Sequence, residues 1–287
     1  MKWTRKKKYA EQDYTESMLP KNRKEVFFDV IKLNWKSFLS QGLVILLFSI
    51  PLIIVSVLQQ LIYLETSSLE ITEQEMLYLL SGQANTFALI KIPCIVILFV
   101  GLAGIIRMVR QYAWEENVLF SVDFTKGIKS NVGFMILVGL IVGITNWMSV
   151  WCSNQVGFAT NTIQSILLYL PVLFFALLLL PLSFYFVVCV SIYNVKFGTL
   201  LKMSFISFAK KPFKTYLAVL CCLPFFVLLL IPNTICIFLG YLITPLLLPF
   251  VLLGAYLFAL NVLDDVINKQ YYPELVDRGL FKEELPQ

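Results

Sequence analysis

The side chains of this chain that could carry out chemistry are few, and Lys91 is the most conspicuous. It lies near the start of an apolar stretch, residues 87–108, with no other charge before Arg107. An ionisable residue within such a stretch is a candidate for function, so Lys91 could be a counter-charge or contact a substrate, with Glu65 or another nearby acid as its partner. The alternative, which we favour, is that its long side chain reaches out to the nearby interface.

A second apolar stretch, residues 132–152, contains a polar residue and a glycine pair. Asn146 could line a cavity, or its amide could hydrogen-bond a neighbouring helix. Gly139 and Gly143 have the spacing that lets two helices approach closely. We interpret this pair as packing, either within the chain or between copies of it.

Groups that enzymes commonly use are scarce. The chain has no His, which removes the commonest general base and metal ligand. Its six Cys have no zinc-site spacing, although Cys152 and Cys236 could form a bridge. Asp264 and Asp265 could bind a cation, but we interpret them as solvated loop acids. We therefore expect no enzymatic activity, no cofactor and no metal site.

The elements that must position these residues are apolar helices. Hydrophobic residues make up 59% of the chain and charged residues 14%, whereas soluble domains carry about 25% charged residues. A helix that spans a bilayer needs about 20 mainly apolar residues. The sequence predicts an all-α integral membrane protein with six transmembrane helices, at about 40–64, 87–108, 132–152, 166–190, 215–236 and 240–263.

The charge distribution predicts an orientation. If the chain folds at these six stretches, 22 of the 23 Lys and Arg residues fall on one side, with Lys91 as the exception. Basic residues near the ends of spans stay in the cytoplasm, so we expect a multi-pass protein of the bacterial inner membrane with both termini cytoplasmic. Basic residues that flank apolar spans, rather than forming one soluble face, argue against nucleic-acid binding.

The predicted organisation is one membrane domain with two tails. Residues 1–24 form a flexible cytoplasmic tail, residues 25–263 the membrane domain, and residues 264–287 a second cytoplasmic tail. In the outer segment 65–85, Thr72 and Glu75 predict a capping box, and Gly82 could end a short helix. The turn between the last two spans lies at Pro232-Asn233-Thr234 or nearer Gly240.

An amphipathic stretch precedes every second span. The three stretches are residues 26–39, 119–130 and 197–211, each with aromatic residues on one helical face and charged residues on the other. Such helices lie in the membrane interface. The chain then reads as three parallel repeats of an interfacial helix and a two-span hairpin. The alternative is that any helix before a span has this composition.

One segment carries a family resemblance. Gly101-Leu-Ala-Gly104, followed by Arg107, Arg110, Glu115 and Glu116 and then by residues 122–131, resembles the YesL-like bacterial membrane proteins. The pattern is a span that ends in small residues, a basic helix, and an acid-aromatic pair, Asp123-Phe124, that leads into an amphipathic helix ending near Asn131. The resemblance does not imply any particular biochemical activity. It does imply a link with bacterial carbohydrate uptake systems.

These observations predict a non-enzymatic membrane protein that assists another membrane system. Its expected partners are the lipid bilayer and a membrane transport permease subunit, the latter from the resemblance alone. The alternative is a transporter or lipid-handling protein in its own right, for which the proline-rich spans argue. A homo-oligomer held through faces such as that of Gly139 and Gly143 is a third hypothesis.

Overall fold

The chain folds entirely into helices and turns within the residues that the computed structural model describes, 20–159, 161–230 and 234–281. The predicted N-terminal tail, apart from its last five residues, lies outside the described residues, as do Pro232 and Asn233 of the predicted turn. In this part of the chain, five segments are long and apolar enough to cross a membrane: residues 23–67, 73–113, 120–156, 162–192 and 235–271.

The elements follow in a simple order. The helices are α1 (Arg23–Ser67), α2 (Glu73–Ala113), α3 (Phe120–Val156), α4 (Thr162–Phe174), α5 (Leu180–Ile192), α6 (Phe197–Lys210), α7 (Pro212–Cys222), α8 (Val227–Leu230), α9 (Thr234–Leu263) and α10 (Lys269–Tyr271). One π-helical turn, η2 (Phe175–Leu179), joins α4 to α5, and another, η4 (Asp264–Asn268), joins α9 to α10. The 3₁₀ turns are η3 (Leu223–Phe226) and η5 (Pro273–Leu275).

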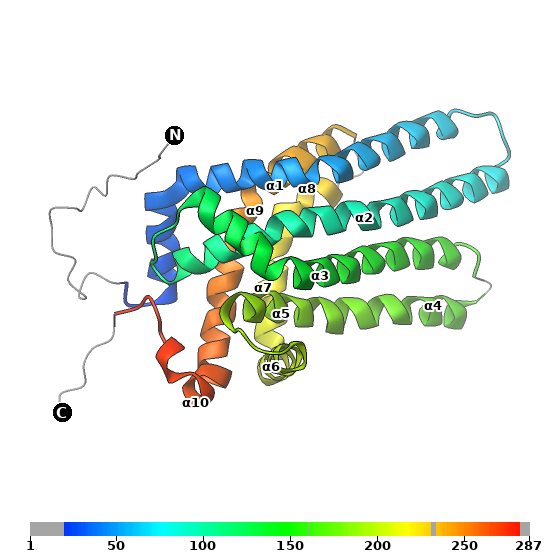
Figure 1. The fold of residues 1–287 in the computed structure, drawn as a ribbon. Coiled ribbons are helices and arrows are strands. Elements are labelled where there is room, and N and C mark those ends of the chain that lie inside the picture. The colour runs from blue at the N-terminus through cyan, green and yellow to red at the C-terminus, as the bar shows by residue number, and fades with distance from the viewer. Residues whose placement is uncertain (1–19, 160, 231–233, 282–287) are drawn as a thin grey trace, which may run out of the picture.

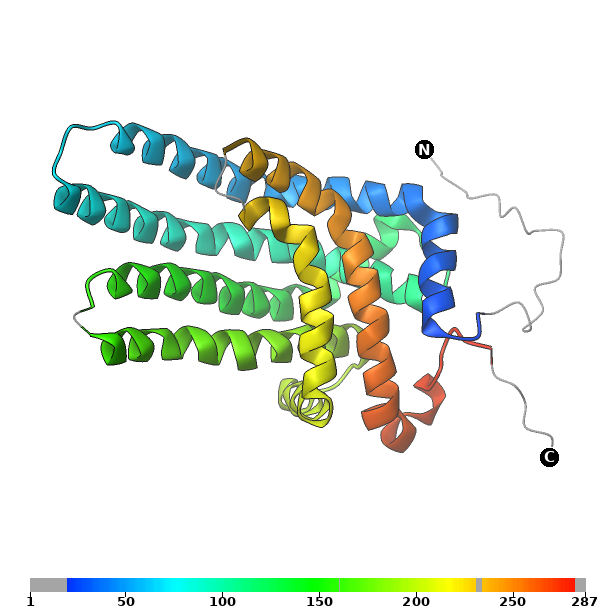
Figure 2. The ribbon, with the colours of Figure 1, turned by 180° about the vertical axis from the view of Figure 1, so that it is seen from behind.

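Helices α1, α2 and α3 and the continuous helix formed by α4, η2 and α5 form one layer, in which successive helices lie side by side (Figure 1). The connection 68–72 and the described residues 157–159 and 161 between α3 and α4 lie at one end of this layer, which we call the loop end. Pro20 and Phe281 lie at the opposite end, the terminal end, where the Phe281 amide donates to the Pro20 carbonyl over 3.0 Å. Seen from behind, α7 and much of α9 cross the layer steeply near this end (Figure 2).

The structure can be compared with the predicted boundaries of several elements. The first two amphipathic stretches are not separate helices but the bent first parts of α1 and α3 (Figure 1). The capping box at Thr72 and Glu75 is confirmed, but α2 continues through Gly82, because nothing there interrupts its backbone hydrogen bonds. Gly240 lies within α9, which begins at Thr234, and this favours the first of the two predicted turn positions.

The fifth predicted span, residues 215–236, is broken in the structure. It corresponds to α7, η3 and α8, and α7 is shorter than a bilayer requires. Pro224 lies at the start of the 3₁₀ turn, consistent with the missing amide hydrogen and fixed φ of proline. The buried core lies toward the terminal end, where α1, α2, α5, α6 and α9 meet.

Candidate functional site

Helices α2 and α3 are in close contact at the small residues of the family-like segment. A Cβ on Gly127 of α3 would lie 2.9 Å from the Gly104 Cα and from the Ala103 carbonyl oxygen. A Cβ on Gly104 would lie 2.3 Å from the ring of Phe124. Gly104 and Ala103 of α2 therefore form the surface on which the acid-aromatic segment of α3 packs, whereas Gly101 faces Phe48 of α1. The structure brings both halves of the motif together.

Asp123 lies next to this contact, and its side chain is buried instead of facing water on the polar side of the helix. Its carboxylate accepts a hydrogen bond from the Leu119 amide over 2.7 Å, which caps the start of α3, and it lies 3.8 Å from Arg107 Nε. Asn131, one of the sequence-predicted residues, is also buried, two turns farther along α3. Asp123 and Phe124 therefore position α3 against α2, and Asn131 belongs to the buried side of α3.

A buried ion pair links the first helix to the last long one. Arg23 Nη2 donates to Asp264 Oδ2 over 2.9 Å, and their side chains are 11% and 5% exposed. Asn268 donates to the other Asp264 oxygen over 2.7 Å and accepts a hydrogen bond from the Tyr193 hydroxyl. The interpretation of Asp264 as a solvated loop acid is therefore wrong. Its partner, Arg23, lies 241 positions away in the sequence.

Asp265 behaves differently from its neighbour. It is partly exposed and pairs with Lys211 and with Lys269, the latter over 3.1 Å. The helical path continues through both aspartates as η4 and α10, so the predicted C-terminal tail begins as a continuation of α9. Residues 282–287 of that tail lie outside the described residues.

A second group of polar contacts surrounds Trp114 at the end of α2. The Arg110 and Arg278 guanidinium groups lie 5.0 and 4.2 Å from the Trp114 ring centroid, both in cation–π geometry. Arg278 also donates to Glu116 over 2.8 Å. Arg110 donates to the Ser191 carbonyl of α5 over 2.7 Å, and this contact joins α2 to α5.

The segment after α10 closes over these groups. Gly279 has a φ of +83° and lies so close to Trp114 that a Cβ would be 2.9 Å from the Trp114 Cα. The Arg278 carbonyl accepts a hydrogen bond from Arg23 over 2.8 Å. These contacts hold residues 278–281 against the start of α1 and against residues 113–116 at the end of α2.

Glu115 is the unusual acid of this region. It has a φ of +54°, in the left-handed region, where it ends the α2 helix. Burial, with a smaller contribution from the negative charge of Asp29, raises the pKa of Glu115 to about 7. Its protonation therefore changes near neutral pH.

Lys91 finds a neutral partner rather than an acid. Its ammonium group donates to Gln59 Oε1 of α1 over 2.6 Å, and the side chain is partly buried between α1 and α2. Among the described ion pairs none joins Lys91 to Glu65 or another acid of the loop end, so the less favoured alternative of an acidic partner is not what this structure shows. Lys91 thus links two helices.

A hydrogen bond to a neighbouring helix is one expectation for Asn146, and its neighbour Trp147 makes such a bond. The Trp147 indole donates to Asn85 of α2 over 2.8 Å, while Asn146 is half-buried beside it. Nearer the loop end, Asn154 donates to the Ser81 carbonyl over 3.0 Å. These hydrogen bonds join α3 to α2 along its outer half.

Gly139 and Gly143 pack within the chain. Cβ atoms at these positions would lie 3.1 Å from the Val96 Cα and 3.2 Å from the Ile92 Cα, both in α2. Of the two packing alternatives, the structure therefore supports the one within the chain. The glycine pair already has a partner, which removes it as a face for a homo-oligomer.

The described residues form open surface grooves, but no metal-binding cluster and no disulfide. Two open grooves, of about 490 and 370 Å³, lie on α2 near the loop end and share Tyr78 and Leu79. No described group of three or more Cys, Asp or Glu side chains is placed to hold a metal ion. The six cysteines, which all lie in the described part of the chain, form no disulfide there, so Cys152 and Cys236 are not bridged.

The polar network at the terminal end is what the sequence interpretation missed. Its members Arg23, Tyr193 and Asn268 are each ordinary at the end of a membrane helix, where charged and amphipathic side chains are expected. The one available signal was that Asp264 follows directly on a long apolar stretch. In comparisons, this chain matches no protein-family model, no curated protein and no solved structure.

Proposed function

We propose that this protein is a non-enzymatic protein of the bacterial inner membrane that acts as an accessory or assembly partner of a transport system. The observation that carries the proposal is the contrast between the two ends of the molecule. The terminal end is held by buried ion pairs and hydrogen bonds, whereas much of the surface of the long helices is apolar and uncovered. Such a surface suits contact with lipid and with other membrane helices.

Helix α4 is the strongest candidate for contact with a partner. Not one of its residues is buried, and its main neighbour is α3. The residues Ile163, Leu167, Leu170 and Phe174, which are spaced along one helical face, are all at least half exposed. Because lipid tails are as apolar as leucine, a partner helix would gain from packing rather than from the hydrophobic effect.

The proposed topology has six crossings with both termini in the cytoplasm. The positive-inside distribution supports this orientation, since in the sequence all Lys and Arg residues other than Lys91 fall on one side of the six apolar stretches. We assign α7–α8 and α9 to a third hairpin, steeply inclined to the other two (Figure 2). A reporter that is active only in the periplasm should work at Asn154 and fail at the C-terminus.

The three-repeat organisation is part of the proposal. In this view, the bent first parts of α1 and α3 correspond to α6, which Lys211 separates from α7. Each unit would then be an interfacial segment followed by two apolar helices. The common topology of the three units supports the arrangement, which implies a pseudo-axis along the membrane normal.

The class of the partner comes from the resemblance to the YesL-like proteins. That resemblance, in residues 101–131, favours a permease of a carbohydrate uptake system. The segment lies at the contact of α2 with α3, where it serves packing. The proposal therefore assigns partner contact to α4 and the stability of the scaffold to the motif.

A transporter or lipid-handling protein is the second candidate. The π-helical turn η2, between Pro171 and Pro181, favours it, since such turns are frequent at functional sites. A transport pathway, however, requires polar groups along a passage between helices. The two grooves near the loop end are lined mainly by apolar residues and lie on the surface of the α1–α2 hairpin.

The test is a pull-down of the full chain, tagged at its C-terminus, from membranes in mild detergent, followed by mass spectrometry. A double variant, L167W/L170W, would obstruct the exposed face of α4. The matched control, L43W/L47W, makes the same change at two exposed leucines of α1. We expect stoichiometric recovery of a permease with the natural protein and the control, and its loss with the α4 variant.

Recovery of the natural protein alone, with a lipid or small molecule bound, would contradict the accessory role and support the second candidate. Equal recovery of the permease with both variants would remove α4 as the contact. A deletion strain should also lose abundance of the permease in the membrane. Unchanged permease levels and uptake in that strain would count against the proposal.

A further inference from the structure

The outward face of helix α6 carries apolar side chains, whereas a helix that faces water would carry polar side chains there. The side that packs against the protein includes two serines, Ser204 and Ser207, both fully buried. Their hydroxyls donate to the Leu200 and Met203 carbonyls of the preceding turn, so they need no other partner. The buried side also carries Leu200, Met203 and Phe208, and the outward side carries a second set of apolar residues.

The outward stripe has helical spacing. Phe197, Leu201 and Phe205 follow one another at intervals of four residues and are 44%, 42% and 52% exposed. They belong to the face that the sequence predicted to be apolar, and among its members only Phe208 is buried. Beyond the end of α6, Phe213 is 88% exposed and extends the apolar surface. Three aromatic rings in water would be unfavourable.

Basic residues border this stripe without acidic partners. Lys196, Lys202, Lys210 and Lys214 are all exposed, and the described ion pairs include none of them. Lys211, by contrast, pairs with Asp265. The chain itself could hardly supply nearby acids, because it has no Asp or Glu between Asp123 and Asp264.

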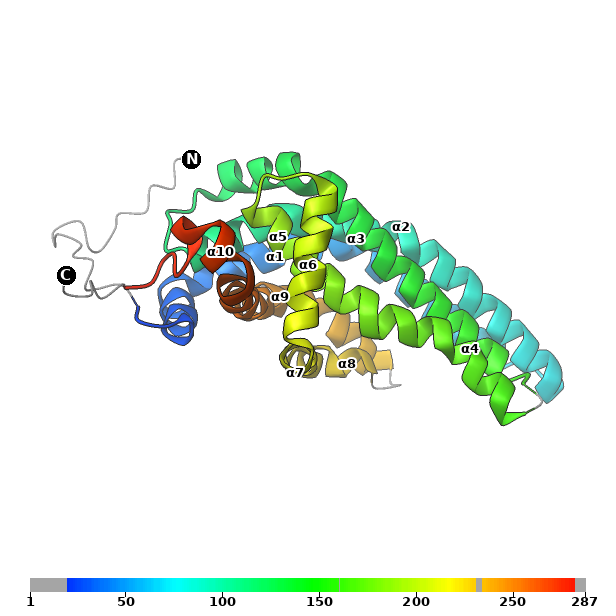
Figure 3. The ribbon, with the colours of Figure 1, turned by 90° about the horizontal axis from the view of Figure 1, so that it is seen from below.

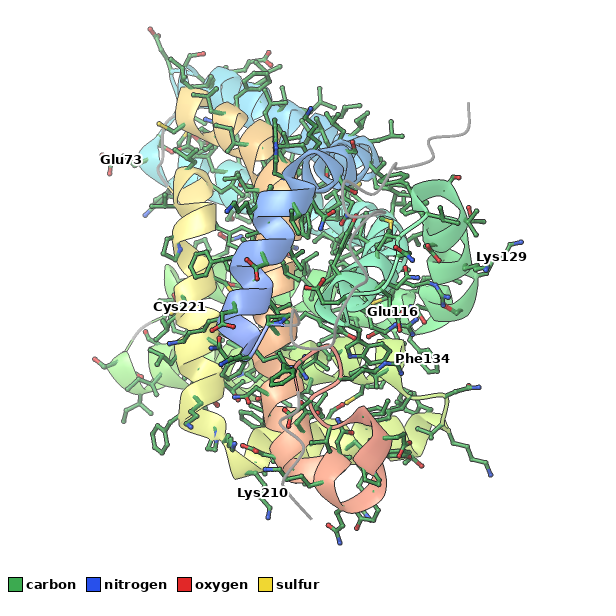
Figure 4. The ribbon with its side chains drawn as sticks, turned by 90° about the vertical axis from the view of Figure 1, so that its left-hand side faces the viewer. Glu73, Glu116, Lys129, Phe134, Lys210 and Cys221 are labelled. Carbon is green, nitrogen blue, oxygen red and sulfur yellow. The ribbon has the colours of Figure 1, made fainter. Side chains whose placement is uncertain are left out.

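The direction of α6 also sets it apart. It is seen end-on in Figure 1, where α2 to α5 run across the view, and lengthwise in Figure 3. It therefore crosses the direction of the long helices steeply. Viewed toward the terminal end, Lys210 and Lys129 point outward at two separate edges (Figure 4). A helix in this direction can lie along a membrane surface while α2 to α5 cross it.

We propose that α6 and the start of α7 form a binding surface for anionic phospholipids. Phe197, Leu201 and Phe205 enter the boundary between headgroups and acyl chains, and the four lysines contact the headgroup phosphates. An apolar stripe flanked by lysines fits this surface because each half of the lipid has a matching group. A cytosolic protein would satisfy the charges but would have to cover the exposed parts of three apolar side chains, of which Phe197 also packs on Phe134 and Phe186.

The first experiment tests whether the apolar stripe of α6 lies in the lipid or in water. One cysteine at a time replaces Phe205 or, as a control on the same helix, Thr199, in a full chain whose Cys221, Cys222 and Cys236 are alanines. The three cysteines that remain, Cys94, Cys152 and Cys189, are buried. Each is labelled with a nitroxide, in vesicles of phosphatidylglycerol and phosphatidylcholine. We expect collisions with oxygen to dominate at 205 and collisions with a water-soluble nickel complex at 199. Dominance of nickel at both positions would overturn the proposal.

The second experiment tests the charge. The variant K202Q/K210Q/K214Q removes three positive charges, and K202R/K210R/K214R keeps them. Retention of phosphatidylglycerol on the purified full chain should fall with the glutamine variant by on the order of fivefold for each charge lost, and stay unchanged with the arginine variant. Equal retention by all three proteins, or equal binding of phosphatidylcholine, would contradict the role of the lysines.

Discussion

Gly127 of α3 lies against Gly104 of α2, so closely that a Cβ on Gly127 would be 2.9 Å from the Gly104 Cα. The same added atom would lie 2.9 Å from the Ala103 carbonyl oxygen. Neither neighbour is the flexible end of a side chain, so the backbones themselves would have to separate. This contact fixes how the α1–α2 hairpin meets the rest of the layer.

Replacing Gly127 with alanine should therefore destabilise the protein. We expect a loss of about 1–3 kcal/mol, the usual cost of overpacking, measured as a lower melting temperature in detergent. Gly133→Ala on the same helix is the matched control, because a Cβ there meets no atom within 4 Å. An equal effect of both changes would mean that loss of glycine, rather than the contact, is responsible.

The Arg23–Asp264 pair should behave as a buried ion pair. Arg23→Met leaves the Asp264 carboxylate buried without its cation, so we expect a loss of about 3–5 kcal/mol of unfolding free energy. The double variant R23M/D264N should recover much of this loss, because the uncompensated charge is gone. Lys269→Met, which removes an exposed partner of Asp265, should have no measurable effect. Additive losses in the double variant would contradict direct coupling.

Glu115 should make stability depend on pH. Its pKa is raised from 4.5 to about 7 in the folded protein, so the folded state holds the proton more tightly than the unfolded chain. Stability is therefore lost as the pH rises from about 4.5 through 7. Glu115→Gln should match the natural protein at pH 4 and melt at a higher temperature at pH 8. A constant difference across this range would show that the carboxyl does not titrate there.

Gly139 and Gly143 should affect folding rather than assembly. Leucine at both positions would push α3 away from Val96 and Ile92 of α2, and the melting temperature should fall. The size of the particle in size-exclusion chromatography with light scattering should not change while the protein is folded. Gly133→Leu controls for a larger side chain on α3. A smaller particle for G139L/G143L alone would restore the oligomer hypothesis.

Lys91 should contribute through Gln59. The change Gln59→Leu leaves the ammonium group without the oxygen that it donates to, and we expect a loss of about 1–3 kcal/mol. The double variant Q59L/K91M should regain most of the stability, since both polar groups are then absent. If Q59L has no effect, Lys91 reaches the interface without help from α1.

The sequence by itself determined the local features of this protein. Long apolar stretches must form helices in a membrane, because every backbone group has to be paired within its own segment. The capping box at Thr72 and Glu75 depends on residues three positions apart, and it formed as predicted. The spacing of Gly139 and Gly143 likewise indicated close packing before the neighbouring helix was known.

Only the tertiary structure decided which ends of the helices meet. A charge at the end of an apolar stretch looks the same in sequence whether it is solvated or buried, so the partner of Asp264 could not be recognised across 241 positions. The outward face of α6 and the steep crossing of α9 also depend on contacts between distant segments. Helix formation follows from neighbouring residues, whereas burial and ion pairing follow from the way the helices assemble.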